Sequence, residues 1–143
     1  MKRIKLILAM ILGLTAVSAV CHADGRIIPP QQLPAAIQSF VQQHFPDATI
    51  AYAEKEMRKY EVHLNDGTEL DFTRKGDWDK VDCKFKPVPA VLVPQPIAAY
   101  VEATFPGSSI VKIDKEYYGY EIELSNDLEL KFNQAGQLFS MDD

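Results

Sequence analysis

The stretch YEVHLNDGTELDF at residues 60–72 returns as YEIELSNDLELKF at residues 120–132. Apolar and polar residues alternate in both stretches, which is typical of strands with one buried face. The Asn-Asp-Gly at 65–67 is a strong signal for a hairpin turn, and Ser-Asn-Asp at 125–127 is a weaker form of it. Each stretch therefore predicts an antiparallel β-hairpin.

These hairpins lie within a longer internal repeat. With an offset of 60 residues, residues 33–83 align with 93–143 without a gap, and 16 of the 51 pairs are identical. Two copies are too few for a solenoid, and a unit of about 50 residues is small for an independent core. We expect one domain, residues 24–143, in which the two repeats share a core.

A helix is expected at the start of each repeat. Apolar residues recur at three-to-four-residue spacing from Leu33 to Phe45 and from Ile97 to Phe105, and a proline after each phenylalanine ends the pattern. The proline-rich segment 86–96 is expected to be an extended linker between the repeats rather than a helix.

Further strands are expected at 50–54 and 110–114, and a short one after each of Gly76 and Gly136. The predicted fold class is α+β: two tandem α-β-β-β-β repeats that form one antiparallel sheet, with the helices packed on one face. The other face would carry polar and charged side chains and lie open to water.

The first 23 residues have the features of a signal peptide. Lys2, Arg3 and Lys5 precede an apolar run of about 15 residues, which is shorter than the roughly 20 that a membrane-spanning helix needs. Cleavage after Ala23 would leave Cys83 as the only thiol, whereas cleavage after Ala19 would retain Cys21 and permit one disulfide. We expect a periplasmic or secreted protein with no membrane span once the signal is removed.

The charge of the chain narrows the choice of partners. The full sequence has 15 basic and 20 acidic residues, a net charge of −5 and a pI of about 5.2; without residues 1–23, which carry three basic residues and no acidic one, the net charge is −8. An acidic chain disfavours a nucleic-acid partner and attracts basic partners.

The motifs resemble a known family. Phe45-Pro46, the strand 60–64, Glu69-Leu70-Asp71-Phe72 and Gly76 recur in the second repeat as Phe105-Pro106, 120–124, Glu129-Leu130-Lys131-Phe132 and Gly136. In this arrangement the chain resembles the PepSY-like, β-lactamase-inhibitor-like proteins. The resemblance implies a tandem α+β domain of the cell envelope with a binding or inhibitory role.

No catalytic set stands out in the sequence. HExxH, CxxC and GxSxG motifs are absent, and the chain beyond residue 23 contains only two histidines, His44 and His63. We therefore expect no enzyme activity, no cofactor and no metal site. The alternative is a small envelope enzyme or metal-binding protein centred on His63, which shares the polar strand face with carboxylates.

The leading hypothesis is a non-enzymatic module that binds a protein or peptide through the open sheet face. Its more specific forms are a basic partner and the inhibition of a protein or peptidase. The aromatic pair before Gly119 is expected in a turn and would suit an interface. The candidate contact residues are Glu61, His63, Asp71, Tyr117, Tyr118, Glu121 and Glu123.

Overall fold

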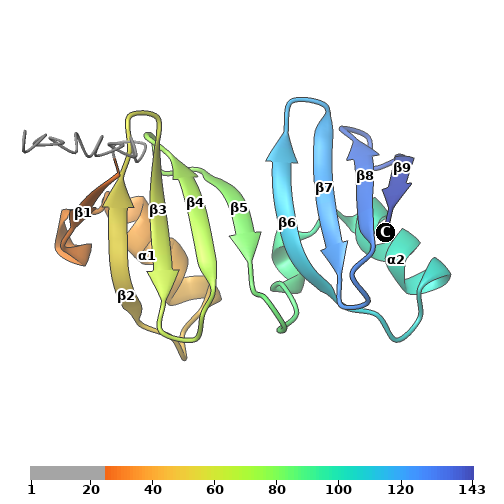
Figure 1. Cartoon of the computed structure of the whole chain (residues 1–143), viewed down its shortest axis with the longest axis horizontal. Helices are drawn as coiled ribbons and strands as arrows, with labels where there is room; N and C mark the ends of the chain where they lie inside the picture. The colour runs from red at the N-terminus through yellow and green to blue at the C-terminus, as the bar shows by residue number, and fades with distance from the viewer. Residues whose placement is uncertain (1–24) are drawn as a thin grey trace, which may run out of the picture.

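The nine strands of the sheet lie side by side in the same order as they occur in the chain, and each pairs antiparallel with the next (Figure 1). The computed structural model describes residues 25–143. The strands are β1 (Arg26–Ile28), β2 (Ile50–Lys55), β3 (Lys59–Leu64), β4 (Glu69–Thr73), β5 (Trp78–Asp82), β6 (Ile110–Glu116), β7 (Gly119–Leu124), β8 (Glu129–Asn133) and β9 (Leu138–Asp142). The expected α+β class with a single antiparallel sheet is confirmed.

Two α-helices lie on the same side of this sheet (Figure 1). Helix α1 (Ala35–His44) buries Ile37 and Val41, and α2 (Gln95–Thr104) buries Ile97 and Val101. A short 3₁₀ helix precedes each of them: η1 (Pro30–Gln32) and η2 (Ala90–Leu92). The sheet therefore has an inner face under the helices and an outer face without them.

Side-chain alternation along the strands sets up the inner apolar layer. In β3, Tyr60, Val62 and Leu64 are buried while the residues between them are partly exposed. The phenylalanines Phe72 and Phe132 are fully buried. Phe40 of α1 meets Phe72 edge-on at 5.2 Å, and Tyr100 of α2 meets Phe132 in the same way at 5.6 Å. The two helices thus cover the sheet through equivalent aromatic contacts.

The β3–β4 and β7–β8 hairpins have the expected tight turns. Gly67 has a φ of 91° in the first turn, and Asp127 has a φ of 69° in the second. Glycine adopts this left-handed backbone freely, and aspartate tolerates it better than most residues. The second turn therefore keeps its shape without a glycine.

Strands β5 and β6 join the two halves of the molecule, which we define as the first half (residues 26–83) and the second half (residues 86–142). The opposed residues are Lys80 and Asp114, Val81 and Ile113, and Asp82 and Lys112. The backbone N–H of Cys83 also donates to the carbonyl of Val111 at 2.9 Å. A single sheet thus runs through both halves.

Two details differ from the expected α-β-β-β-β pattern. Strand β1 precedes α1 and pairs with β2, and the helical periodicity gave no sign of this three-residue strand. The linker expected to be extended over residues 86–96 contains η2, and α2 already begins at Gln95. Pro94 is the N-cap of α2 and Pro96 lies in its first turn, where a missing N–H and a fixed φ are harmless.

The predicted signal peptide, Cys21 included, lies outside the described residues. Cys83 is a buried free cysteine, and burial raises its pKa to about 11. Because the thiolate is the reactive form, this cysteine is a packing residue at neutral pH. Within residues 25–143, no helix has the length and hydropathy needed to cross a membrane.

Candidate functional site on the outer face of the sheet

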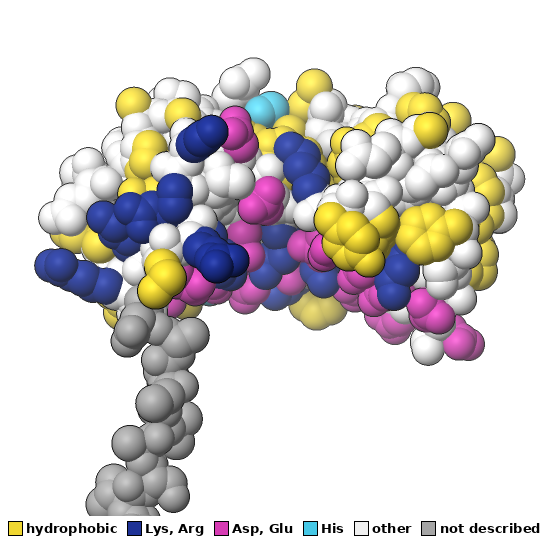
Figure 2. Space-filling model, turned by 90° about the horizontal axis from the view of Figure 1, so that it is seen from above, with side chains coloured by type: hydrophobic (Ala, Val, Ile, Leu, Met, Phe, Trp, Pro, Cys, Tyr) yellow, Lys and Arg dark blue, Asp and Glu magenta, His cyan; other side chains and the backbone are white. Residues whose placement is uncertain are grey.

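The charged side chains of the strands gather on the outer face. Figure 2 shows the molecule from above the view of Figure 1, and acidic and basic side chains line its lower edge, on the side of the sheet opposite the helices. The same view shows exposed hydrophobic groups beside acidic ones on the second half. The candidate site lies on this face, and its composition differs between the two halves.

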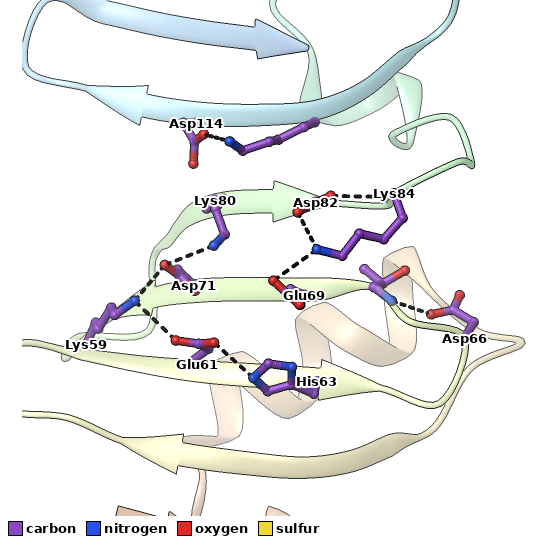
Figure 3. A network of polar contacts seen from close by, with 12 residues as sticks. Lys59, Glu61, His63, Asp66, Glu69, Asp71, Lys80, Asp82, Lys84 and Asp114 are labelled. Atoms are coloured by element: carbon purple, nitrogen blue, oxygen red, sulfur yellow. Dashed lines mark hydrogen bonds and ion pairs between the residues drawn. The ribbon is translucent and has the colours of Figure 1, made fainter. Parts of the chain in front are cut away.

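In the first half the charged side chains pair with one another in a continuous network (Figure 3). Lys59 Nζ lies 2.9 Å from Asp71 Oδ2 and 3.3 Å from Glu61 Oε2. His63 Nε2 lies 2.9 Å from Glu61 Oε1, and Lys80 Nζ lies 3.7 Å from Asp71 Oδ2. We call these five residues the Lys59 network. Three predicted contact residues, Glu61, His63 and Asp71, belong to it.

The Lys59 network changes the pKa values of its members. Burial alone would raise the pKa of Glu61, but the hydrogen bond and charge of Lys59 and the charge of His63 bring it below its ordinary value. Burial likewise opposes the charged form of Lys59, yet its contacts with Asp71 and Glu61 raise its pKa well above the usual range. Both groups are therefore charged at neutral pH and neutralise each other.

Asp71 is less open to water than the expected solvated face implies. Its residue exposure is 9%, and one carboxylate oxygen, Oδ1, is buried without a hydrogen-bond partner. Lys59 and Lys80 approach the other oxygen from the two neighbouring strands. Their side chains cover the carboxylate, so Asp71 is part of the sheet rather than an accessible contact residue.

Further ion pairs lie on either side of the joint between the halves (Figure 3). Lys84 Nζ contacts Asp82 at 2.7 Å and Glu69 at 3.1 Å, and Lys112 contacts Asp114 at 3.1 Å. Burial raises the pKa of Asp114 in spite of the nearby Lys112. This part of the outer face, like the Lys59 network, pairs its own charges.

The second half leaves acidic groups unpaired. Within residues 25–143, Glu121 and Glu123 form no ion pair, although Lys131 lies close by and binds Glu129 and Asp142 instead. Glu121 accepts a hydrogen bond of 3.1 Å from the Tyr118 hydroxyl. Burial and this bond to a carboxylate raise the pKa of Tyr118.

Aromatic side chains adjoin these carboxylates. Tyr117 and Tyr118 form the turn between β6 and β7, and their rings pack edge-on at 5.2 Å. The Tyr118 ring packs in the same way against Phe139 of β9 at 5.3 Å. Tyr117 is 91% exposed and Phe139 is 57% exposed. We call Tyr117, Tyr118, Glu121, Glu123 and Phe139 the aromatic–acidic patch.

The seven predicted contact residues thus fall into two separate groups. The Lys59 network holds three of them, and the aromatic–acidic patch holds Tyr117, Tyr118, Glu121 and Glu123. The sequence reasoning missed the roles of Lys59 and Lys80, which cover Asp71. The cross-strand register that brings these lysines to Asp71 is visible only in the folded sheet.

His63 does not stand free as a ligand or base. Its ring stacks on Tyr52 at 4.2 Å between centroids, and its Nε2 is held by Glu61. In the part of the chain that the structure describes, no three His, Cys, Asp or Glu side chains converge in a way that could hold a metal ion. The contacts of His63 are those of a residue packed into the sheet surface.

The helical side of the molecule carries a groove in each half that the sequence did not predict. The groove beside α2 has a volume of about 450 Å³, and the one beside α1 about 380 Å³. They occupy equivalent positions: Val41, Gln42 and Ile50 line the first, and Val101, Glu102 and Ile110 line the second. Gln38 crosses the first groove to donate to the Leu33 carbonyl at 2.9 Å, whereas Ala98 leaves the second more open.

Comparison with known families accounts for this architecture. Residues 21–70 and 58–140 match the family described as "Putative beta-lactamase-inhibitor-like, PepSY-like". The chain belongs to the PepSY-like family. The resemblance expected from the repeated motifs is thereby confirmed. No curated protein matches this PepSY-like chain.

Solved structures of similar proteins support the assignment. A putative periplasmic protein of unknown function from Bacteroides vulgatus is 36% identical, with a TM-score of 0.78 over 83% of this chain and 99% of its own. A second B. vulgatus periplasmic protein is 35% identical, with a TM-score of 0.79 over 84% and 98%. A putative calcium-regulated periplasmic protein from Bacteroides thetaiotaomicron is also 35% identical, with a TM-score of 0.78 over 84% and 98%.

Proposed function

We propose that this PepSY-like protein is a non-enzymatic binding module of the periplasm that captures a basic protein or peptide on the outer face of its second half. Three observations support a periplasmic location. They are the signal-peptide pattern of residues 1–23, the similar putative periplasmic protein of unknown function, and the similar putative calcium-regulated periplasmic protein. We also infer that the two halves are tandem copies of one α-β-β-β-β unit, because equivalent elements lie 60 residues apart.

The observation that carries the proposal is the contrast in charge pairing along the outer face. Glu61 forms an ion pair with Lys59, whereas its counterpart Glu121 forms none within residues 25–143; it accepts a hydrogen bond from the Tyr118 hydroxyl and lies opposite Lys131. Unpaired carboxylates attract a cationic partner from a distance, and exposed aromatic rings supply the apolar contact area that anchors it. Tyr117 and Phe139 offer that area, since both rings pack against Tyr118, whose hydroxyl binds Glu121.

Inhibition of an enzyme is one form that such binding would take. The family description names β-lactamase-inhibitor-like proteins, and capture of a basic peptidase or other enzyme on the aromatic–acidic patch would block access to it. The alternative centred on His63 draws less support, since Tyr52 and Glu61 already occupy the ring face and one nitrogen.

The proposal is tested by capture from an envelope extract at low and high salt, with mass spectrometry of the retained proteins. A double variant, Glu121→Lys with Glu123→Lys, should reduce capture of the main partner about tenfold, and salt should do the same because exposed charges are screened. Glu61→Lys is the matched control at the equivalent position in the first half, and it should leave capture nearly unchanged.

Two results would contradict the proposal. Equal capture by the wild type and the double variant would remove the patch from the binding surface. Loss of capture in a His63→Ala variant alone would favour the His63 alternative. Because one relative is described as calcium-regulated, parallel runs with calcium and with a chelator show whether capture depends on this ion.

A further inference from the structure

Strand β9 ends the sheet with an unpaired edge. It hydrogen-bonds to β8 on one side and has no neighbour on the other within the described part of the chain. Met141, the fourth of the five residues of this strand, is 44% exposed. Edge strands carry a row of free backbone N–H and C=O groups, and an extended peptide can pair with them.

The same edge is already paired in the first half. Strand β5 is equivalent to β9, and its corresponding edge binds β6. Val81 stands where Met141 stands in β9, and it is 0% exposed because Ile113 of β6 lies opposite. The pairing of β5 with β6 therefore indicates the kind of strand that the equivalent edge of β9 can accept.

Strands β5 and β9 each have a register shift near their start, and in β5 this shift does not prevent pairing with the next strand. β9 has a register shift opposite Lys131 and Phe132, and β5 has the equivalent shift opposite Asp71 and Phe72. In β5 the paired residues begin at Lys80, beyond the shift. The matching stretch of β9, from Ser140 to Asp142, is regular in the same way.

The hydrogen-bond phase identifies the backbone groups that point outward. Cys83 donates to Val111, and hydrogen-bonded pairs in an antiparallel ladder alternate with non-hydrogen-bonded ones. Val81 and Ile113 therefore form the next hydrogen-bonded pair. By the same phase, the N–H and C=O of Met141 point out from the free edge of β9.

We propose that β9 takes up an extended segment of a basic partner protein as a tenth, antiparallel strand. This segment has an aliphatic residue opposite Met141, as Ile113 is opposite Val81, and a lysine or arginine opposite Asp142, as Lys112 is opposite Asp82. Burial would raise the pKa of Asp82, but the contacts of Lys84 and, across this joint, the charge of Lys112 bring it below its ordinary value. The inference rests on the proposed function and adds the mode of binding.

The aromatic–acidic patch lies beside this edge. Phe139 belongs to β9 itself, and its ring contacts Tyr118, whose hydroxyl binds Glu121. A strand added to β9 presents its outward side chains along Phe139 and its backbone to Met141. Backbone pairing then supplies affinity, and the basic side chain supplies the charge selection.

The test uses a peptide copied from β6, the strand that the equivalent edge binds. The probe is Ser109–Glu116 with Asp114→Lys and Glu116→Lys, acetylated and amidated, and its binding to the purified full chain is measured by fluorescence anisotropy. N-methylation of the Ile113 nitrogen removes a donor that faces β9 and should weaken binding about tenfold. N-methylation at Lys112, whose nitrogen faces away, is the matched control and should have little effect.

A charge exchange tests the register independently. Asp142→Lys should weaken binding of the probe, and a probe with Lys112→Glu should restore it. Asp142 lies on the exposed end of the strand, so the exchange costs the fold of β9 only the ion pair of Asp142 with Lys131. Failure of the restoring peptide would exclude the proposed pairing of Asp142 with the residue at 112.

The outcomes distinguish this inference from the proposed function. If neither N-methylation matters but Glu121→Lys with Glu123→Lys abolishes binding, the patch captures basic peptides and the edge inference is wrong. No binding of the unmodified probe at millimolar concentration also overturns it. Dimerisation of the chain alone, lost in a Met141→Pro variant, would assign the edge to a second copy and likewise overturn it.

Discussion

The two halves of the molecule bury nearly the same apolar layer and expose different outer faces. Phe72 and Phe132, Leu70 and Leu130, and Leu64 and Leu124 occupy equivalent buried positions. On the outer face, Lys59 is replaced by Gly119, and Asp71 by Lys131. Packing against a helix restricts the inner residues to apolar side chains of similar volume, whereas the outer face can change its charges without loss of the fold.

Gly119 in place of Lys59 removes one ion-pair partner from the position beside Glu121. Gly119 has a φ of 147°, and a side chain there would collide with the backbone oxygen of Phe132, 2.2 Å from the ideal Cβ position. No lysine can therefore stand at this position to neutralise Glu121. The close approach of β7 and β8 and the acidity of the patch are two results of one substitution.

The largest expected effect concerns the shared inner layer. Phe72→Ala and Phe132→Ala should each lower the free energy of unfolding by about 3–5 kcal/mol, since both leave a large cavity under an aromatic ring of the helix. Denaturant titration followed by tryptophan fluorescence and by circular dichroism measures both. Two separate transitions, or a loss confined to one variant, would mean that the halves do not unfold as one unit.

An intermediate effect is expected at Gly119. Gly119→Ala should cost about 2 kcal/mol or more because the added Cβ meets backbone atoms. Gly67→Ala is the matched control: its φ is 91°, but nothing lies within 4 Å of the added atom, so about 1 kcal/mol is expected. Thermal unfolding of both variants makes the comparison, and equal losses would rule out the steric account of Gly119.

The smallest effects concern the lysines of the outer face. Lys59→Met leaves the half-covered Asp71 carboxylate with Lys80 alone and should cost about 1–2 kcal/mol. Lys131→Met breaks pairs with the more exposed Glu129 and Asp142 and should cost less stability than Lys59→Met. A larger loss of stability in Lys131→Met than in Lys59→Met would contradict the difference in charge pairing between the outer faces of the two halves.

The Lys59 variant should also change the acid side of the stability profile. The pKa of Glu61 in the folded protein lies below its ordinary value of 4.5, so its contribution is present above that pH and is lost as the pH falls through the folded-state pKa. Lys59→Met removes the main group that lowers this pKa. Denaturant titrations between about pH 6 and pH 2 should therefore show a shallower acid loss in the variant, and an unchanged slope would contradict the assignment.

The sequence predicts the inner face well because periodicity is a local property. Alternation along 60–64 and 120–124, with Asn65-Asp66-Gly67 between strands, is sufficient to predict the hairpins and their buried side. Strand β1 escaped prediction because Arg26-Ile27-Ile28 is too short to display a period. The burial of Asp71 also escaped, since it depends on lysines that arrive from β3 and β5, and only the register between strands brings them together.

In the candidate site, too, some features follow from the local sequence and others depend on the neighbouring residues in the folded sheet. The exposure of Tyr117 in a turn follows from its place before Gly119, and the structure has that turn. Glu61 and Glu121 are the same residue type, so the difference in their ion pairing does not follow from these two residues themselves. It depends on the residue two places earlier on the same strand, a lysine at 59 and a glycine at 119, and on the residue opposite, Asp71 for Glu61 and Lys131 for Glu121.

The order of the strands has a consequence for how the chain folds. Each strand pairs only with the strands immediately before and after it in the sequence, from β1 to β9. Contacts between near neighbours in the chain close short loops and form quickly. A chain that emerges N-terminus first can therefore add each new strand to a sheet already in place, so that no exposed edge waits long for a distant partner and the window for aggregation stays short.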